Sequence, residues 1–247
     1  MLFVAEIGMN YDGNIDLAYE LIRQAKLAGA DIAKFQFGWR DKPGEINVID
    51  HERAARLQSW CDYWGIEMLA SLITEPAVEL AHHIGMRRYK IASRTVVDNP
   101  ALCERIIAEG KETFVSLGMW EGKEFPFGTP GPANVRYIFC RSKYPTYPAD
   151  LVGLPERFEA GGYYGYSDHL HGTEACVLAV ARGARYIEKH FTLNRTSSVI
   201  RDHVLSATPA EFRQLTEVAR PLARLLEVVD GHGRAVRGRA EAELTRS

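Results

Sequence analysis

The sequence predicts an α/β protein, folded as a single-domain (β/α)8 TIM barrel, and three observations support this fold class. The chain has 247 residues, of which 46% are hydrophobic, and this is enough apolar surface to bury one large core. Apolar runs of strand length recur eight times, and a stretch with helical periodicity follows most of them. An open doubly wound sheet has the same local pattern, but eight alternating units favour a closed barrel.

The expected strands and helices alternate along the chain. The expected strands are residues 2–7, 31–37, 66–72, 88–92, 113–117, 135–140, 163–167 and 186–191. Between the first two, residues 16–29 place apolar side chains at intervals of three and four residues and end at Gly29, a natural helix stop. Similar helices are expected at residues 52–64, 75–84, 100–109, 173–182 and 209–228, with less regular connections between the fifth, sixth and seventh strands.

The expected domain boundary lies near the end of the chain. Residues 1–228 form the predicted barrel domain. Residues 229–247 are rich in Gly, Arg, Ala and Glu and carry little apolar surface, so we expect a linker-like tail there.

Charge and composition argue against several classes of partner. The formal net charge is −2, from 30 basic and 32 acidic residues mixed along the chain, so no basic block is available for nucleic acid or anionic lipid. The N-terminus lacks a basic leader and no apolar stretch is long enough to span a membrane, so we expect a cytoplasmic protein. Cys61, Cys103, Cys140 and Cys176 are widely spaced, which predicts neither a zinc cluster nor disulfides. Cys140 and Cys176 are interpreted as small core residues.

Reactive side chains gather where the expected strands end, which is where barrel enzymes carry their chemistry. These residues are Glu6, Lys34, Gln36, Ser71, Lys90, Ser93, Ser116, Ser142, Ser167, His169, Glu188 and His190. Buried lysines and glutamates are costly unless they are paired or bind a ligand. Any one of them could be a structural residue whose hydrogen bonds are satisfied within the fold. Structural polar residues would be scattered, however, and would not concentrate at the ends of the strands. The set therefore predicts one active site.

The residue types in this set indicate two kinds of binding. Lys34 and Lys90, with several hydroxyls, would hold a small polyanion that carries both phosphate and carboxylate. Because the sequence contains no glycine-rich phosphate loop, a nucleotide is not indicated. His169 and His190 would form an open two-imidazole metal site. Glu188 could be a further ligand, an acid–base group or a residue that orients the ligands.

Short motifs in a fixed order extend over nearly the whole chain. They are Ala5-Glu-Ile-Gly-Met-Asn10 with Gly13, Gly29-Ala-Asp-Ile-Ala-Lys-Phe-Gln36, Tyr89-Lys-Ile-Ala-Ser93, Ser116-Leu-Gly-Met119, Lys143-Tyr-Pro-Thr146, Gly165-Tyr-Ser-Asp-His169, Glu188-Lys-His-Phe191 and Asp202-His203. Each motif alone is weak, but together and in this order they are specific. With these motifs the sequence resembles the N-acetylneuraminate (sialic acid) synthase family, including its pseudaminic and legionaminic acid members.

The resemblance implies a metal-dependent condensation of phosphoenolpyruvate with an aldose such as N-acetylmannosamine, which gives a deoxy α-keto sugar acid and releases phosphate by C–O cleavage. Phosphoenolpyruvate would be held by Lys34, Ser71, Lys90, Ser93, Ser116, Ser142 and Ser167. The metal, expected to be manganese, with cobalt, iron, zinc or magnesium also compatible, would bind His169 and His190. The acceptor sugar would face Glu6, Gln36, Tyr144 and Asp202, and the expected catalytic residues are Glu6, Glu188 and Lys90. The resemblance also implies a homodimer.

The chain departs from the family pattern in ways that bear on the reaction. Ser93-Arg94-Thr95 stands where the family has Ser-Gly-Glu, so a carboxylate proposed to handle a proton is missing and Glu6 or Glu188 would have to serve. Ser116-Leu-Gly-Met119 lacks one family hydroxyl, whereas Ser71 keeps the hydroxyl of the usual Thr. The relatives continue into an antifreeze-like domain that contacts the acceptor, and this chain ends in what resembles the linker to it. We therefore expect a different or smaller acceptor, or a separate partner that completes the site.

Two other functions are compatible with the same residues. A Schiff-base aldolase could use Lys34 or Lys90, because a desolvated lysine on a barrel strand becomes nucleophilic. That reaction leaves the two histidines without a role. A non-catalytic barrel that binds a sugar acid or phosphate and acts with a partner protein is the third possibility, and the retained lysines, hydroxyls and histidines argue against it.

Overall fold

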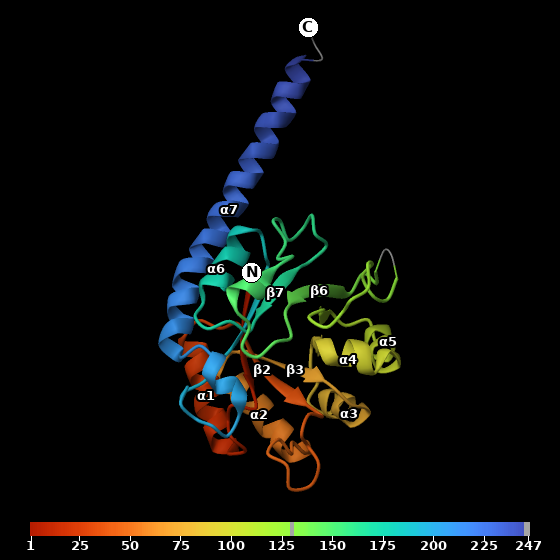
Figure 1. Ribbon diagram of the computed structural model, residues 1–247, viewed down its shortest axis with the longest axis vertical. Helices are drawn as coiled ribbons and strands as arrows, with labels where there is room; N and C mark the ends of the chain where they lie inside the picture. Colours follow the sequence, from red (N-terminus) through yellow and green to blue (C-terminus); the bar gives the residue numbers. More distant parts are fainter. Residues whose placement is uncertain (129–130, 245–247) are drawn as a thin grey trace.

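Eight parallel strands form a closed barrel in chain order in a computed structural model (Figure 1). The structure describes residues 1–128 and 131–244, and from residue 230 onward it describes the backbone only. The strands are β1 (Leu2–Gly8), β2 (Ile32–Phe37), β3 (Glu67–Leu72), β4 (Tyr89–Ile91), β5 (Thr113–Ser116), β6 (Val135–Cys140), β7 (Gly165–Asp168) and β8 (Tyr186–His190). β1 pairs with both β2 and β8, which closes the barrel. The predicted fold class is thus confirmed, and the open sheet is excluded.

Helices surround the barrel, as the sequence pattern predicted. They are α1 (Ile15–Leu27), α2 (His51–Trp64), α3 (Glu75–His83), α4 (Ser93–Asp98), α5 (Pro100–Ala108), α6 (Glu174–Ala181) and α7 (Pro209–Leu244), with two 3-10 helices, η1 (Pro148–Leu151) and η2 (Arg201–Leu205). In the described parts of the chain, no α-helix connects β5 to β6 or β6 to β7, which agrees with the irregular connections expected there. α4 was not predicted, because its six residues are too few to show a helical period and its first residue has no side-chain cap.

α7 differs from its expected length. Its helical backbone continues to Leu244, so residues 229–244, expected as a linker-like tail, are helical, and Figure 1 shows them extending beyond the barrel. The buried side chains of α7 include Phe212, Leu215 and Ala219, which lie in its first turns. The boundary of the barrel domain near residue 228 stays a prediction.

The barrel interior contains a hydrophobic layer below a polar one. Side chains alternate between the two faces of a strand, so inward-facing residues lie two apart. The hydrophobic inner layer consists of Val4, Ile32, Leu69, Phe114, Ile138 and Tyr186, all fully buried. Two residues further along the same strands are Glu6, Lys34, Ser71, Ser116, Cys140 and Glu188. The strand sequences therefore close the bottom of the barrel with hydrophobic packing and direct charged and hydroxyl side chains toward its C-terminal end.

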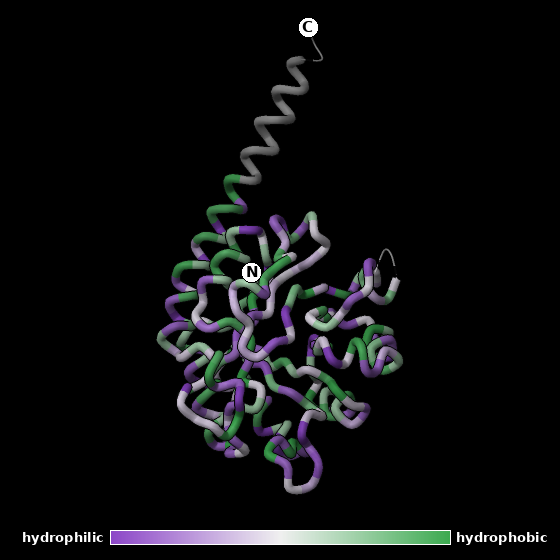
Figure 2. Tube along the Cα trace, in the orientation of Figure 1, coloured by the Kyte–Doolittle hydropathy of each residue, from purple (hydrophilic) through white to green (hydrophobic). Residues whose placement is uncertain are grey.

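A second and larger hydrophobic cluster lies between the barrel and its helices. It combines outward-facing strand residues such as Phe35 and Ile187 with helix residues such as Leu21, Leu57 and Ile106. Figure 2 shows hydrophobic and hydrophilic stretches alternating along the helices, which is the pattern of helices with one buried face. In the described part of the chain, no helix is long and apolar enough to cross a membrane.

Candidate active site

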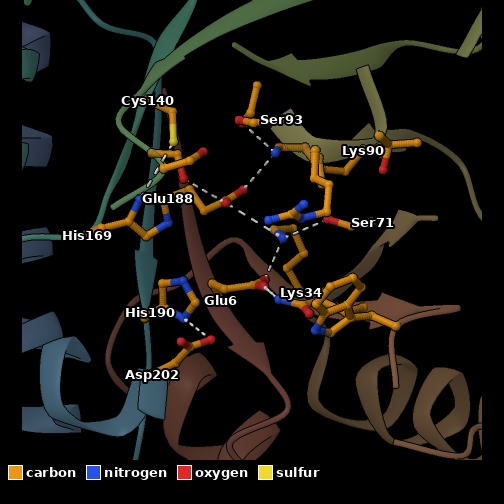
Figure 3. Close-up of a pocket in the computed structure, with 18 of the residues that line it drawn as sticks. Glu6, Lys34, Ser71, Lys90, Ser93, Cys140, His169, Glu188, His190 and Asp202 are labelled. Carbon is orange, nitrogen blue, oxygen red and sulfur yellow. Dashed lines mark hydrogen bonds and ion pairs between the residues drawn. The ribbon is translucent and has the colours of Figure 1, made fainter. Parts of the chain in front are cut away.

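A cavity of about 310 Å³ opens at the C-terminal end of the barrel. Its lining includes every residue that the sequence placed in the site: Glu6, Lys34, Gln36, Ser71, Lys90, Ser93, Ser116, Ser142, Tyr144, Ser167, His169, Glu188, His190 and Asp202. These residues lie on seven of the eight strands or in segments that follow a strand, and Figure 3 shows those it labels directed toward a common space. Their individual roles stay predictions, but their spatial clustering is a property of the structure.

Lys34 lies at the centre of a buried charge network. Its Nζ is 2.6 Å from Glu6 Oε2 and 3.6 Å from Glu188 Oε1, and it donates a hydrogen bond of 3.1 Å to Ser71 Oγ. The register of the barrel produces these contacts, because Glu6 pairs with Lys34 between β1 and β2. Gln36, two residues further along β2, donates a 2.9 Å hydrogen bond to Glu6 Oε1. Two strands thus hold the Glu6 carboxylate between an ammonium and an amide.

Glu188, on β8, contacts both lysines. Its Oε2 is 3.8 Å from Lys90 Nζ, and the hydroxyls of Ser167 and Tyr186 donate hydrogen bonds to the carboxylate. Burial alone would raise the pKa of Glu188, but Lys34 and Lys90 outweigh it and lower the pKa to about 2. Glu188 is therefore a permanent anion at neutral pH.

The two carboxyl groups have opposite pKa shifts. Burial raises the pKa of Glu6, and this effect and the nearby Glu188 charge exceed the attraction of Lys34. Burial also lowers the pKa of Lys90, although the Glu188 carboxylate opposes the shift. Lys90 donates a 2.6 Å hydrogen bond to Ser116 Oγ. A pair of carboxyl groups with divergent pKa values can divide acid–base and electrostatic work between them.

His169 and His190 face each other across neighbouring strands, with ring centroids 5.2 Å apart. His169 Nδ1 is 2.8 Å from the carbonyl oxygen of Arg141, an acceptor that would fix the proton on Nδ1 and leave Nε2 free. His190 Nδ1 is buried and has no hydrogen-bond partner among the described residues, and it lies 3.9 Å from Asp202 Oδ2. Burial, together with the charges of His169 and Lys34, lowers the pKa of His190 well below its ordinary value. A neutral, unpartnered imidazole is the form that binds a metal ion.

His169 and His190 would suit a metal ion as an open site with two protein ligands. Among the residues that the structure describes, no group of three or more His, Cys, Asp or Glu side chains is arranged to hold a metal. The unpartnered Nδ1 of His190 and the free ring nitrogen of His169 fit a cation that completes its coordination with water or substrate. Burial alone would lower the pKa of His169, but the charge of a Cys140 thiolate and the hydrogen bonds to Cys140 and to the Arg141 carbonyl raise it, so a proton would compete with a metal there.

Cys140 corrects one sequence interpretation. It was expected to be a small core residue, yet it lines the cavity, and its Sγ lies 3.6 Å from His169 Nδ1. Strand parity could have revealed this position, since Cys140 is two residues beyond the inward-facing Ile138 and pairs with Ser167 on β7. Cys176, in contrast, is fully buried and donates a hydrogen bond to Asp168, as expected of a core residue.

Other cavity residues were not predicted as site residues. Trp39, Ile73, Ala92, Arg94, Thr95, Met119 and Arg201 also line the cavity. Arg94 and Thr95 were noted only as departures from the family motif, and Arg201 adjoins the predicted Asp202 in sequence. These residues lie on loops and short helices, where no strand period predicts the direction of a side chain.

Behind the histidines, a buried ion pair joins β7 to β8. Lys189 Nζ is 2.8 Å from Asp168 Oδ2, and both side chains are completely buried. Asp168 Oδ1 also accepts hydrogen bonds from the Tyr166 hydroxyl (2.7 Å) and the Leu170 backbone N–H (3.1 Å). Since Asp168 precedes His169 and Lys189 precedes His190, the ion pair connects the two strand ends that carry the imidazoles.

Sequence comparison assigns the chain to a family. The model of the NeuB family matches residues 45–230. The chain belongs to the NeuB family. The mouse N-acetylneuraminate-9-phosphate synthase is 31% identical over 254 residues, a match that covers 90% of this chain and 70% of the mouse protein. The N,N'-diacetyllegionaminic acid synthase of Legionella pneumophila is 27% identical, covering 90% of this chain and 72% of the relative. The predicted resemblance and the prediction of a sialic acid synthase-like enzyme are confirmed.

Solved structures agree with this assignment. The sialic acid synthetase of Leptospira borgpetersenii, determined in complex with citrate, superposes with a TM-score of 0.79 at 27% identity, covering 91% of this chain and 84% of the other. The spore coat polysaccharide biosynthesis protein SpsE of Bacillus subtilis superposes with a TM-score of 0.75 at 25% identity, covering 92% of this chain and 69% of the other. Both likenesses extend over nearly the whole of this NeuB-family chain.

Proposed function

We propose that this NeuB-family protein condenses phosphoenolpyruvate with an aldose to form a deoxy α-keto sugar acid and phosphate, in a metal-dependent reaction with C–O cleavage. The observation that carries the proposal is the buried cluster of Lys34, Lys90, Glu6 and Glu188 beside two histidines on the wall of one cavity. The similarity to named sialic acid and legionaminic acid synthases supports the same reaction.

In this proposal, Lys34 and Lys90 bind the phosphate and carboxylate of phosphoenolpyruvate, with directed hydrogen bonds from hydroxyls such as Ser71 and Ser116. Ser93, Ser142 and Ser167 supply further hydroxyls on the same cavity wall. Glu6, Gln36, Tyr144 and Asp202 face the acceptor. A divalent ion on His169 and His190, with manganese as our first choice, would polarise the acceptor aldehyde.

The divergent pKa values assign different roles to the two glutamates. C3 of phosphoenolpyruvate forms a bond to the aldehyde carbon, and the aldehyde oxygen takes the proton that Glu6 holds at its raised pKa. The positive charge that develops at C2 is stabilised by Glu188, which stays anionic. Water then adds to C2 and returns one proton to Glu6, which leaves a hydroxyl and the phosphate ester on the same carbon. The C2–O bond to phosphate then breaks, the hydroxyl becomes the ketone, and its proton leaves on the phosphate with the bridging oxygen. This cycle needs no further carboxylate, so it is compatible with Thr95 at the position where the family resemblance implies Glu.

The fate of the bridging oxygen tests this reaction. Phosphoenolpyruvate labelled with oxygen-18 at the C2–O–P bridge is incubated with an aldose and manganese, and the released phosphate is analysed by mass spectrometry. We expect the label in phosphate and none in the keto acid, with turnover abolished by a chelator and restored by manganese. Label retained by the keto acid would mean P–O cleavage and would refute the proposed mechanism.

A Schiff-base aldolase is the second candidate, and one observation favours it. Burial lowers the pKa of Lys90, and a lysine with a lowered pKa is a better nucleophile. Borohydride trapping of a pyruvate adduct on Lys90, with full turnover in the presence of a chelator, would support the aldolase over the synthase.

Assembly and location follow as parts of the same proposal. We propose a homodimer, with a separate partner protein contributing to the acceptor site if the isolated chain proves inactive. We also propose a cytoplasmic location, with which the four buried free cysteines agree, because a reducing compartment keeps thiols free.

A further inference from the structure

The connection between β8 and α7, residues 192–207, forms a closed loop at the cavity wall. The Thr192 N–H donates a 3.0 Å hydrogen bond to the Ala207 carbonyl, and the Ala207 N–H donates a 2.8 Å bond to the His190 carbonyl, so the two ends of the loop lie side by side. Between them, Asp202 lines the cavity, and its Oδ2 is 3.9 Å from His190 Nδ1 (Figure 3). The position of this loop therefore decides where the Asp202 carboxylate lies.

A buried histidine in this loop is hydrogen-bonded through both ring nitrogens. His203 is 1% exposed, its Nε2 is 2.8 Å from Asp12 Oδ1, and its Nδ1 is 2.7 Å from Thr192 Oγ1. A carboxylate can only accept, so the Nε2–H donates to Asp12, and Nδ1 is left to accept from the Thr192 hydroxyl. Asp12 follows β1 and Thr192 follows β8, so His203 fastens the loop to the ends of two neighbouring strands.

The segment after β1 holds the same loop at two further points. The Asp12 Oδ2 accepts a 3.1 Å hydrogen bond from the Ser197 hydroxyl. Asn10 Nδ2 donates a 3.0 Å bond to Ser206 Oγ, which in turn donates a 2.6 Å bond to the Asp202 carbonyl. Asp12 has a φ of +54°, in the left-handed region that Asp and Asn tolerate better than other residues with a side chain. The backbone of this segment thus presents the carboxylate to the loop.

The hydrogen-bonded residues themselves lie outside the cavity. In the described part of the chain, Asp12, Thr192 and His203 are not among the residues that line it, whereas Asp202, next to His203, is. Neither Asp12 nor His203 would therefore touch a substrate. Loss of one member would leave a buried polar group without a partner, which costs free energy and favours movement of the loop. A displaced loop would carry Asp202 with it.

We propose that His203, held between Asp12 and Thr192, is a positioning residue for the acceptor aldose and acts through Asp202. This inference rests on the proposed function, in which Asp202 faces the acceptor. The expected ligands of phosphoenolpyruvate lie on β2 to β5, on β7 and in segments after β4 and β6, and none lies in the loop 192–207. Disturbing the loop should therefore weaken use of the aldose and spare phosphoenolpyruvate. A purely structural histidine would not separate the two substrates.

Substitutions of Thr192 test the proposal with the least disturbance of the fold. Phosphate release from phosphoenolpyruvate is measured with manganese and N-acetylmannosamine. Thr192→Val keeps the shape and removes the hydroxyl, so it should raise the KM of the aldose by about tenfold and change that of phosphoenolpyruvate less than about twofold. Thr192→Ser keeps the hydroxyl and should restore both KM values. Thr113→Val is the matched control, because Thr113 is also fully buried and donates a 2.9 Å bond to the Lys111 carbonyl, but lies at the start of β5, at the opposite end of the barrel. It should change neither KM value.

Substitutions of His203 should give a graded loss. His203→Gln keeps an N–H donor for Asp12 but offers no acceptor to Thr192, and kcat/KM for the aldose should fall by about tenfold. His203→Leu loses both hydrogen bonds, and the fall should reach about a hundredfold. Hydrogen exchange followed by mass spectrometry should show faster exchange in peptides from the loop 192–207 of His203→Leu, with exchange in β2 and β4 unchanged.

The outcomes separate this inference from the proposed reaction. If Thr192→Val raises the KM of phosphoenolpyruvate as much as that of the aldose, or changes neither, the positioning role is overturned and the synthase stands. If N-acetylmannosamine releases no phosphate, its binding to the protein with manganese and phosphoenolpyruvate is measured by calorimetry. Binding weakened by Thr192→Val and not by Thr113→Val would then support the positioning role although the reaction fails. Equal binding in the two variants, or no binding to the wild type, would overturn the positioning role as well.

Discussion

At the scale of single residues, the barrel interior buries charged side chains at positions where hydrophobic side chains would cost less free energy. Lys34, Lys90, Glu6 and Glu188 are all 5% exposed or less, and each is paired with another member of the group. Removing one partner of a buried pair leaves an uncompensated charge, which costs more than the intact pair contributes. Because the pKa of Glu6 is raised and that of Glu188 is lowered, substitution of the two glutamates should have different effects.

For Glu6→Gln, we expect the loss of the proton donor with little change in binding. The amide keeps the size of the side chain and can still hydrogen-bond to Gln36, but it has no proton to transfer. We predict a kcat lower by a factor of about 10² to 10⁴, with the KM of phosphoenolpyruvate within about threefold of wild type. In the wild type, kcat should fall as pH rises through the raised pKa of Glu6, because the acid form is required. Steady-state kinetics across pH checks both points, and a variant that keeps wild-type kcat would remove Glu6 from the mechanism.

Glu188→Gln should instead destabilise the fold. The variant leaves Lys90 without its carboxylate, so we expect the free energy of unfolding at neutral pH to fall by about 3 kcal/mol. Because the folded pKa of about 2 lies below the ordinary 4.5, the stabilising contribution of this carboxylate is present above pH 4.5 and lost as pH falls toward 2. Urea unfolding should therefore show a gap between wild type and variant that narrows below pH 4.5. A gap independent of pH would contradict the assigned charge of Glu188.

At the scale of secondary-structure elements, the site depends on the register between neighbouring strands. Glu6 pairs with His190, and Ser167 with Glu188, so a slip by one residue would turn these side chains toward the helices. The Asp168–Lys189 ion pair lies on the outer face of β7 and β8 and helps to hold that register. The position of the two imidazoles is thus coupled to a contact outside the cavity.

A double-mutant cycle measures the strength of the Asp168–Lys189 ion pair. Asp168→Asn and Lys189→Met each leave one buried charge unpaired, and we expect each to lower the free energy of unfolding by about 3 to 5 kcal/mol. The double variant buries no charge at this position, so its loss should be smaller than the sum by about 2 kcal/mol or more. Chemical denaturation of the four proteins measures the coupling, and strictly additive losses would show that the two residues act independently.

Much of this element-level picture could be predicted from the sequence. All eight strands were located to within a few residues, because strands with hydrophobic inner layers give strong apolar runs. Glu6, Lys34 and Glu188 could be assigned to one site because they end such strands. Arg94, Thr95 and Arg201 lie on short helical segments without a detectable period, so their orientation required the three-dimensional structure. Cys140 shows that residue type alone can mislead. A cysteine suggested the hydrophobic core, but Cys140 lies two residues after the inward-facing Ile138 and therefore faces the cavity.

At the scale of the whole molecule, the barrel combines a hydrophobic floor, a buried charge network and an open mouth. The floor is closed by residues such as Phe114 and Tyr186, whose rings are 4.6 Å apart. Above it, Lys34 and Lys90 lie beside Glu6 and the anionic Glu188, and the histidines occupy one wall (Figure 3). A small trianion and a metal ion would bind such a site together, because each neutralises the other. Membership of the NeuB family agrees with this arrangement.

The most direct test of the central claim is phosphate release from phosphoenolpyruvate with manganese, over aldoses from pentoses to N-acetylmannosamine and its diamino relatives, neutral and phosphorylated. His190→Ala is measured in parallel, with its fold checked by circular dichroism. The account predicts release that requires an aldose and that falls by at least about a hundredfold in His190→Ala. Two results would contradict a metal-dependent synthase: aldose-dependent phosphate release that His190→Ala leaves unchanged, or no phosphate release with any sugar although phosphoenolpyruvate binds.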